Sequence, residues 1–270
     1  NDSTLTADSL TIDFAKPEIT INEIWTTNSD DTLGLVGDTV KVSFTTNEAI
    51  LSDTVTFDGT DMTPYDTVGM QYFYEYVLLG SETGTEISIK LVDLAGNDSL
   101  ITADSVSVDF TNPAITIDSI WTTNSNDTLG LVGDTVNIAF TTNEAILSDT
   151  VKFDGIAMTA YDTVGMQYFY EYVLAGTETG TEISVTLLDL AGNDSTLTAD
   201  SISIDFNKPG ITIDSIWTTN SNDTLGLLGD TVKIAFTTTE ELLSDTVQFD
   251  GQDMTPYDTV GMQYFYEYVL

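Results

Sequence analysis

The stretch DLAGNDSLITADSVSVDFTNPAITI, from Asp93 to Ile117, ends one copy of a repeated unit and begins the next. It opens with a turn rich in Gly, Asn and Asp, and an alternating strand is predicted from Ser105 to Phe110. A second alternating strand follows Asn112-Pro113. Because Pro113 fixes φ and removes a backbone donor, we expect a short, stiff junction between consecutive units.

The repeat has a period of 96 residues. Trp25, Trp121 and Trp217 stand in the same IWTTN context, and 121 − 25 and 217 − 121 both equal 96. Between 17–96 and 113–192 only 16 of 80 positions differ, so 80 − 16 = 64 are identical. A period of this length exceeds the usual solenoid repeat and is typical of a self-contained domain.

The sequence of each complete repeat predicts seven short strands. In the first full repeat they lie at 19–25, 40–44, 55–57, around Met62, and at 70–78, 87–91 and 105–110. Asp58-Gly59 marks a turn, and the face of 70–78 that carries Met70, Tyr72, Tyr74, Tyr76 and Leu78 is expected to point inward. We therefore predict an all-β fold of tandem immunoglobulin-like (Ig-like) antiparallel β-sandwiches arranged as an extended rod. A jelly-roll-like sandwich is the alternative, and it requires an eighth strand.

The period also defines the expected domains. Residues 1–16 are interpreted as the last strand of a preceding Ig-like repeat, 17–112 and 113–208 as complete repeats, and 209–270 as a repeat that lacks its last two strands. Two explanations of these ends stay open. Either the sequence is a window on a longer chain, or the strand at Asn1–Phe14 of one molecule completes the domain at 209–270 of another.

Composition excludes several classes of function. The chain carries 44 acidic residues against 6 basic ones, all lysine, for a net charge of −38, and it has no His and no Cys. Nucleic acid and anionic membranes require a basic face, so neither is an expected partner. No apolar run approaches the roughly 18 residues of a membrane span. Without His, Arg, Cys or a phosphate-binding loop, no enzyme is predicted.

The combination of a Pro-initiated first strand, VGDTVKVSFTTNEAI at 36–50 and VDLAGN at 92–97 resembles bacterial and archaeal Ig-like tandem repeats. Such repeats occur in giant surface adhesins and envelope proteins. The resemblance implies an extracellular, cell-surface location and Ca²⁺ bound at or near the joints between domains. The linker position varies, because Lys16 and Lys208 stand where Asn112 does, so this position is not expected to supply a ligand at every joint.

An Ig-type strand order brings acidic residues from two neighbouring repeats to each joint. For the joint between the two complete repeats these are Asp109, Glu144, Asp189 and Asn193, with Asp31 from an acidic loop. Calcium prefers such hard oxygen ligands, whereas the simpler interpretation is a set of solvated loop tips. Over all joints the predicted calcium ligands are Asp13, Glu48, Asp93, Asn97, Asp31, Asp109, Glu144, Asp189, Asn193, Asp127, Asp205 and Glu240.

Five N-x-[ST] sequons permit glycosylation of a secreted chain. They start at Asn1, Asn97, Asn126, Asn193 and Asn222. Turn chemistry in an Asn-rich and Ser-rich sequence explains them equally well.

Two functions compete. The first is a stiff acidic spacer or a filament or envelope building block, whose partners are the neighbouring repeats and further copies of the chain. The second is an adhesin binding module that presents repeated aromatic or loop surfaces to glycans or partner cells. The second requires solvent-exposed Tyr72, Tyr74 or Tyr76.

Overall fold

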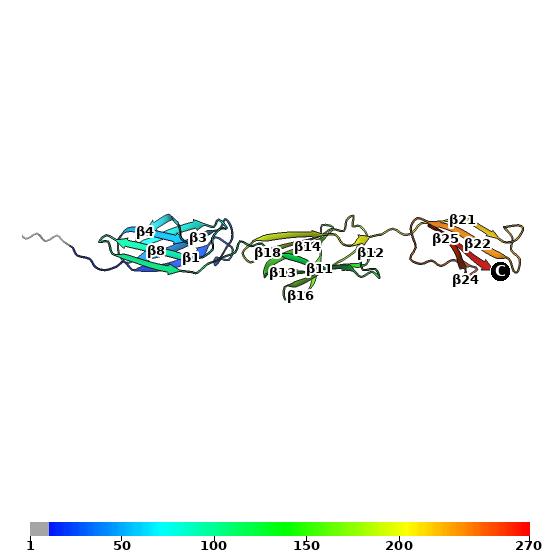
Figure 1. Cartoon of the computed structure of the whole chain (residues 1–270), viewed down its shortest axis with the longest axis horizontal. Coiled ribbons are helices and arrows are strands. Elements are labelled where there is room, and N and C mark those ends of the chain that lie inside the picture. Colours follow the sequence, from blue (N-terminus) through cyan, green and yellow to red (C-terminus); the bar gives the residue numbers. More distant parts are fainter. Residues whose placement is uncertain (1–10) are drawn as a thin grey trace, which may run out of the picture. The chain divides into compact units, whose positions relative to one another are not determined.

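The computed structural model describes residues 11–270, and every regular element in this range is a β-strand (Figure 1). Since these residues form no helix, they contain no helical membrane span. The chain divides into two compact units, the first ending at Ile204 and the second running from Asp205 to Leu270. Three Ig-like sandwich domains follow one another: repeat 1 and repeat 2 in the first unit, and repeat 3 in the second.

Repeat 1 consists of two four-stranded antiparallel sheets and one short parallel pair. The strand orders are β1-β3-β7-β6 and β5-β4-β8-β9, and β10 pairs with β2. This order is the Ig type, in which the two sheets enclose one core. The strands are β1 Ile19–Thr26, β2 Leu33–Gly34, β3 Thr39–Thr46, β4 Ile50–Phe57, β5 Thr60–Asp61, β6 Thr63–Val68, β7 Gln71–Val77, β8 Ile87–Asp93, β9 Asp98–Ala103 and β10 Ser107–Val108.

Repeat 2 reproduces this arrangement strand for strand, with sheets β11-β13-β17-β16 and β15-β14-β18-β19 and the parallel pair β12-β20. Its strands are β11 Ile115–Thr122, β12 Leu129–Gly130, β13 Thr135–Thr142, β14 Ile146–Phe153, β15 Ile156–Ala157, β16 Thr159–Val164, β17 Gln167–Val173, β18 Ile183–Asp189, β19 Asp194–Ala199 and β20 Ser203–Ile204.

Repeat 3 has one four-stranded sheet, β21-β22-β26-β25, and the pair β23-β24. The strands are β21 Ile211–Thr218, β22 Thr231–Thr238, β23 Gln248–Phe249, β24 Gln252–Asp253, β25 Thr255–Val260 and β26 Gln263–Val269. Ile211 and Ile213 are 66% and 58% exposed, whereas their counterparts Ile19 and Ile21 pack against the core of repeat 1. The residues of this unit include no strand equivalent to β8 or β9, which cover that core in repeat 1.

Apolar residues at alternate positions of the strands form the core of repeat 1 between its two sheets. Val42 and Phe44 of β3 and Phe57 of β4 are fully buried. The ring of Phe44 stacks on Tyr72 and Tyr74, with centroids 5.4 and 6.0 Å apart. Such aromatic pairs add stability beyond the area that they bury. The same stacking recurs in repeats 2 and 3.

The prediction of an inward tyrosine face is confirmed for β7. Tyr74 and Leu78 are buried, and Tyr72 and Tyr76 pack against the core from the same face. The prediction is wrong for Met70, which is 47% exposed. Met70 lies in the turn between β6 and β7 rather than in a strand, so the alternation that orients the tyrosines does not reach it.

Two strand predictions need correction. The predicted strand at 105–110 is reduced to β10, and the strand that pairs antiparallel with β8 is β9, for which no strand was predicted. No strand was predicted for β6 either. All residues of β6 are exposed, and β9 has no buried residue. The exposed strand β6 carries little periodic signal. In β9, Ile101 packs against the core but no residue is fully buried, and pairing with a neighbouring strand determines both strands.

The Asp58-Gly59 turn is confirmed. Both residues have positive φ, at 44° and 76°, and they join β4 to β5. Two consecutive positive φ values identify a type I′ turn, whose twist matches the flanking strands. For 1–16, the predicted strand falls mostly on residues 1–10, outside the described range, and residues 11–16 form no strand.

A buried glutamate fixes the loop between β17 and β18. Glu178 is 7% exposed, and its carboxylate accepts hydrogen bonds from the Tyr172 hydroxyl and from the backbone N–H groups of Ala175, Gly176 and Thr177 at 2.7–2.9 Å. Although burial opposes ionisation, these donors lower the pKa of Glu178 to about 2. The ionised carboxylate therefore stabilises the folded repeat.

This loop makes a pH-dependent contribution to stability. Since the folded pKa of Glu178 is depressed, its contribution is present above the ordinary value of 4.5 and is lost as the pH falls toward about 2. We expect Glu178→Gln to destabilise repeat 2 by about 2 kcal/mol at neutral pH, because three N–H groups of the loop lose a charged acceptor. Urea titrations followed by the NMR signals of repeat 2 measure this loss. Repeat 1, which has its own Glu82, serves as the internal control, and equal loss in both repeats would contradict the assignment.

Candidate metal centre

Two groups of three carboxylates occupy equivalent positions in repeats 1 and 2. In each group, one ligand oxygen from each residue lies within 4.8 Å of the others. The first group consists of Asp13, Glu48 and Asp93, and the second of Asp109, Glu144 and Asp189. The structure thus brings together acids that are far apart in the sequence but were predicted to meet where a repeat begins.

The second group draws on both sides of the joint. Asp109 directly follows β10 of repeat 1, where its N–H donates to the Gly34 carbonyl at 2.9 Å. Glu144 lies in the loop between β13 and β14, and its carbonyl accepts a hydrogen bond from the Thr142 hydroxyl at 2.8 Å. Asp189 ends β18 and is 1% exposed. A cation at this position would therefore contact two consecutive repeats.

The Asp-Leu-Ala-Gly-Asn turn shapes the buried end of each group. One oxygen of Asp189 accepts from the N–H groups of Gly192 and Asn193 at 2.7 and 2.8 Å, and the other accepts from the Asn193 side chain at 2.9 Å. Such a carboxylate accepts from backbone N–H groups that a tight turn would otherwise leave unpaired. Gly192 has φ +102°, a backbone conformation that residues with a side chain rarely adopt.

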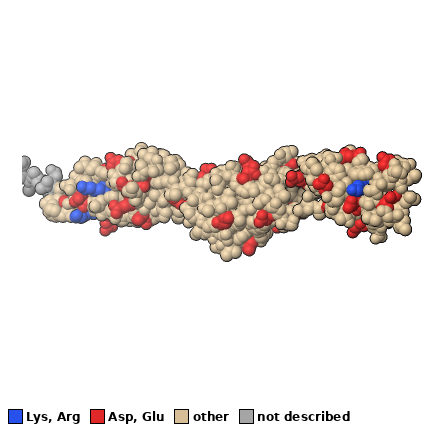
Figure 2. Space-filling model, turned by 45° about the vertical axis from the view of Figure 1, so that its right-hand side comes forward, with Lys and Arg blue, Asp and Glu red and all other residues tan. Residues whose placement is uncertain are grey.

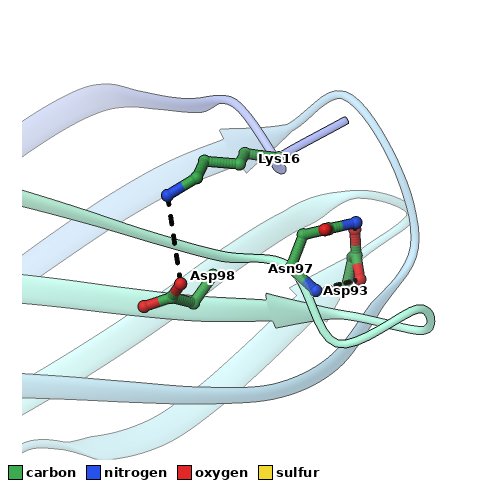
Figure 3. Close-up of polar contacts among 4 residues, drawn as sticks. All are labelled: Lys16, Asp93, Asn97 and Asp98. Carbon is green, nitrogen blue, oxygen red and sulfur yellow. Dashed lines mark hydrogen bonds and ion pairs between the residues drawn. The ribbon is translucent and has the colours of Figure 1, made fainter. Parts of the chain in front are cut away.

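The turn asparagines also contact the chain that enters each repeat. The Asn193 amide donates to the Asp109 carbonyl at 3.1 Å, and the Asn97 amide donates to the Asp13 carbonyl at 3.4 Å. These bonds hold the entering chain beside the buried aspartate. In Figure 3 the Asn97 amide lies against the Asp93 carboxylate, at 2.8 Å.

The carboxylates in each group repel one another. Burial raises the pKa of Glu144, and the charges of Asp109 and Asp189 raise it further. Glu48 is affected in the same way by burial and by Asp13 and Asp93. In addition, Oε1 of Glu144 is buried without a hydrogen-bond partner among the described residues. A bound cation would pair with this oxygen and remove the repulsion.

The donor set fits a hard divalent cation. Calcium takes about 6–8 oxygen ligands, including carboxylates, amide carbonyls and water. Three converging carboxylates provide part of such a shell, and the absence of His and Cys leaves no imidazole or thiolate ligand for a softer metal.

Other predicted ligands lie apart from these groups. Asp31 and Asp127 are exposed on the loops after β1 and β11, where their carbonyls accept the N–H groups of Thr26 and Thr122. Asp205 is exposed and Glu240 half-buried in the second unit, and among the described residues no three-acid group includes them. The third acid of the other groups ends β8 or β18, strands that have no equivalent in the described residues of repeat 3.

One lysine, Lys16, forms an ion pair near the first group of carboxylates. The Lys16 ammonium is 3.9 Å from Asp98, and both side chains are more than half exposed (Figure 3). An ion pair of this kind contributes little to stability. Figure 2 shows the wider balance of charge, with acidic residues distributed over the visible surface of both units and few lysines among them.

The sequons differ in accessibility. Asn126 and Asn222 are exposed in loops. Asn97 and Asn193 use their side-chain nitrogens to bond Asp93 and Asp189, and these bonds would have to break before a glycan could be attached. Asn1 lies outside the described residues.

Sequence reasoning missed Asn28. Its side-chain amide donates to the Ala191 carbonyl at 2.7 Å, across 163 residues of sequence. Nothing local to Asn28 identifies this partner, because the contact joins two different repeats.

Comparison with known proteins gives structural neighbours but no sequence family. Neither a scan against protein-family models nor a search of curated protein sequences found a match. One similar structure is a Ca²⁺-stabilised adhesin of an Antarctic bacterium that binds ice, with 19% identity over 93% of this chain and 66% of that chain and a TM-score of 0.46. A 1.5-MDa bacterial ice-binding adhesin gives 17% identity over 94% and 88% of the two chains, with a TM-score of 0.45. The titin domains z1z2 give 12% over 69% and 97%, with a TM-score of 0.27. At these identities the likeness concerns the fold.

The repulsion within the second group is testable without metal. Since the pKa of Glu144 is raised in the folded state, stability is lost as the pH rises above the ordinary value of 4.5. In a chelator at neutral pH, we expect Glu144→Gln to raise the melting temperature of repeat 2 by about 2 °C. Differential scanning calorimetry measures the change, with Glu182→Gln as a control outside the group. A lower melting temperature for Glu144→Gln would contradict the proposed repulsion.

Proposed function

We propose that this chain is part of an extracellular, cell-surface protein in which tandem Ig-like repeats form a stiff acidic spacer or filament element, and that Ca²⁺ bound where a repeat begins stiffens its joint. The observation that carries the proposal is the group Asp109, Glu144 and Asp189, which combines carboxylates from repeat 1 and repeat 2. A cation held by both repeats would restrict the motion of one against the other.

The charge of the chain supports this role. A net charge of −38 disfavours compact association and favours separation of the repeats. Cations that neutralise the joints would act where repulsion between consecutive repeats is strongest. The same charge favours solubility outside the cell, where Ca²⁺ reaches millimolar levels and weak sites fill.

The competing role as a binding module loses its main support. Tyr74, Tyr170 and Tyr266 are 5–7% exposed, and the tyrosines two residues away on either side also face inward. The strand that would have presented an aromatic surface to a glycan therefore belongs to the core of each repeat.

Calcium should stabilise the repeats that share a site. Ligand at 100 times its dissociation constant adds about 2.7 kcal/mol to a folded state that alone binds it. For a domain of this size we expect a rise in melting temperature of about 10 °C between EGTA and millimolar Ca²⁺. Small-angle X-ray scattering in the same two buffers tests the spacer, for which we expect an extended particle and a narrower distance distribution with Ca²⁺.

Two variants and one control localise the effect. Asp189→Asn and Glu144→Gln should each abolish the calcium-dependent rise, and Glu144→Gln does so without altering the turn. Asp127→Asn removes an exposed acid of the same repeat outside the group and should retain the full rise. Identical melting curves of the parent chain with and without Ca²⁺ would exclude the calcium site, and a collapsed globule in scattering would exclude the spacer.

A further inference from the structure

A second contact between repeats 1 and 2 is made by atoms outside the three-acid group. The loop Thr26–Asp38, which connects β1 to β3, meets the turn Asp189–Asn193 of the following repeat. The Asn28 amide nitrogen donates to the Asp38 carboxylate at 2.8 Å and to the Ala191 carbonyl at 2.7 Å. One bond orients the side chain within its own loop, and the other reaches the next repeat.

A glycine permits this close approach. A Cβ atom added at Gly192 would lie 2.8 Å from Cδ2 of Leu35 in the same loop. Leu35 is half-buried, whereas its counterparts Leu131 and Leu227 are 50% and 68% exposed. Among the described residues, the leucine is thus covered only in the loop of repeat 1, which contacts the Asp189–Asn193 turn of repeat 2.

The turn shows the same difference. Ala191 is 3% exposed, but the equivalent Ala95 is exposed although both stand in Asp-Leu-Ala-Gly-Asn. A Cβ atom at Gly96 would meet nothing within 4 Å. Since the two turns have the same sequence, the loop of the preceding repeat accounts for the burial of the second.

We propose that the loop Thr26–Asp38 is a docking surface whose partner is the Asp-Leu-Ala-Gly-Asn turn of the following repeat, and that this contact orders the joint without metal. The loops of repeats 2 and 3 are built for the same partner, because Asn124 and Asn220 make the corresponding 2.8 Å bonds to Asp134 and Asp230.

The chemistry explains why the partner is a glycine turn. Asn28 offers a second amide hydrogen to a carbonyl, and Leu35 offers an apolar contact that only a residue without a side chain admits closely. Both interactions are weak individually, and the short covalent linker makes them effective by keeping the two partners at high local concentration. This inference rests on the proposed spacer function in one respect, because it assumes that consecutive repeats act together as one mechanical element.

The test compares glycines of equal conformation in the full chain in EGTA. Gly192→Ala and Gly96→Ala both place a side chain at positive φ, but only the first meets Leu35. Residual dipolar couplings report whether repeats 1 and 2 share one alignment tensor. We expect Gly192→Ala to give two different tensors and Gly96→Ala to retain the parent's shared tensor. Shared tensors in Gly192→Ala would overturn the proposal, as would two tensors in the parent.

A second pair of variants distinguishes loss of the contact between repeats from local unfolding of the turn. Asn28→Ala and Asn124→Ala each remove three corresponding side-chain bonds within a loop, but only Asn28 also bonds Ala191. Loss of one amide bond should increase the undocked fraction about five-fold in Asn28→Ala and leave Asn124→Ala unchanged. Equal behaviour of the pair would overturn the proposal. Because all measurements are made in chelator, failure of the calcium site leaves this result intact, and failure of the dock leaves the calcium-dependent melting shift intact.

Discussion

The hydrogen bonds to the Asp189 carboxylate are the interaction on which the joint depends. They close the turn between β18 and β19, the strand and its edge partner that complete the second sheet of repeat 2. They also hold Asn193 where its amide reaches the Asp109 carbonyl at the end of repeat 1. The backbone bonds within the turn use the carbonyls of Asp189 and Asn193 as acceptors, and the Ala191 carbonyl accepts from Asn28. One buried carboxylate thus links the sheet, the entering chain and the preceding repeat.

The same carboxylate creates an electrostatic problem. Asp189 lies beside Glu144 and Asp109, and an acidic chain has few cations with which to compensate. The lysines in the described ion pairs bond other carboxylates, as Lys16 does, and none of these pairs includes a member of a three-acid group. Repulsion that protein groups do not balance is the physical basis for proposing a divalent cation at the joint.

The amide contacts and the acid group act on different parts of the joint. The first are directional and independent of salt, whereas the second depends on cation concentration and on pH. A joint that combines the two would keep its orientation when the cation is absent and gain stiffness when it is present. Such a joint would suit the proposed spacer, in which each repeat has to keep its orientation relative to the next.

Much of this architecture was predictable from the residues. The period of 96, the alternation in β3 and β7 and the Asp-Gly turns predicted Ig-like sandwiches in tandem, because burial on one face of a strand imposes a period of two. The acids that form the two groups were also named from sequence, since an Ig strand order places the ends of particular strands together.

The tertiary structure decided the features that have no local signal. The strands β6 and β9 were missed because edge strands that have no buried residue are defined by their partners. Met70 appeared to continue the tyrosine face, but the turn before β7 places it outside the core. The bond from Asn28 to Ala191 joins residues 163 apart, and two turns of identical sequence differ in burial. Sequence alone determined which groups each repeat carries, whereas only the packing of one repeat on the next decided which of them meet, because that contact depends on distances that no local pattern encodes.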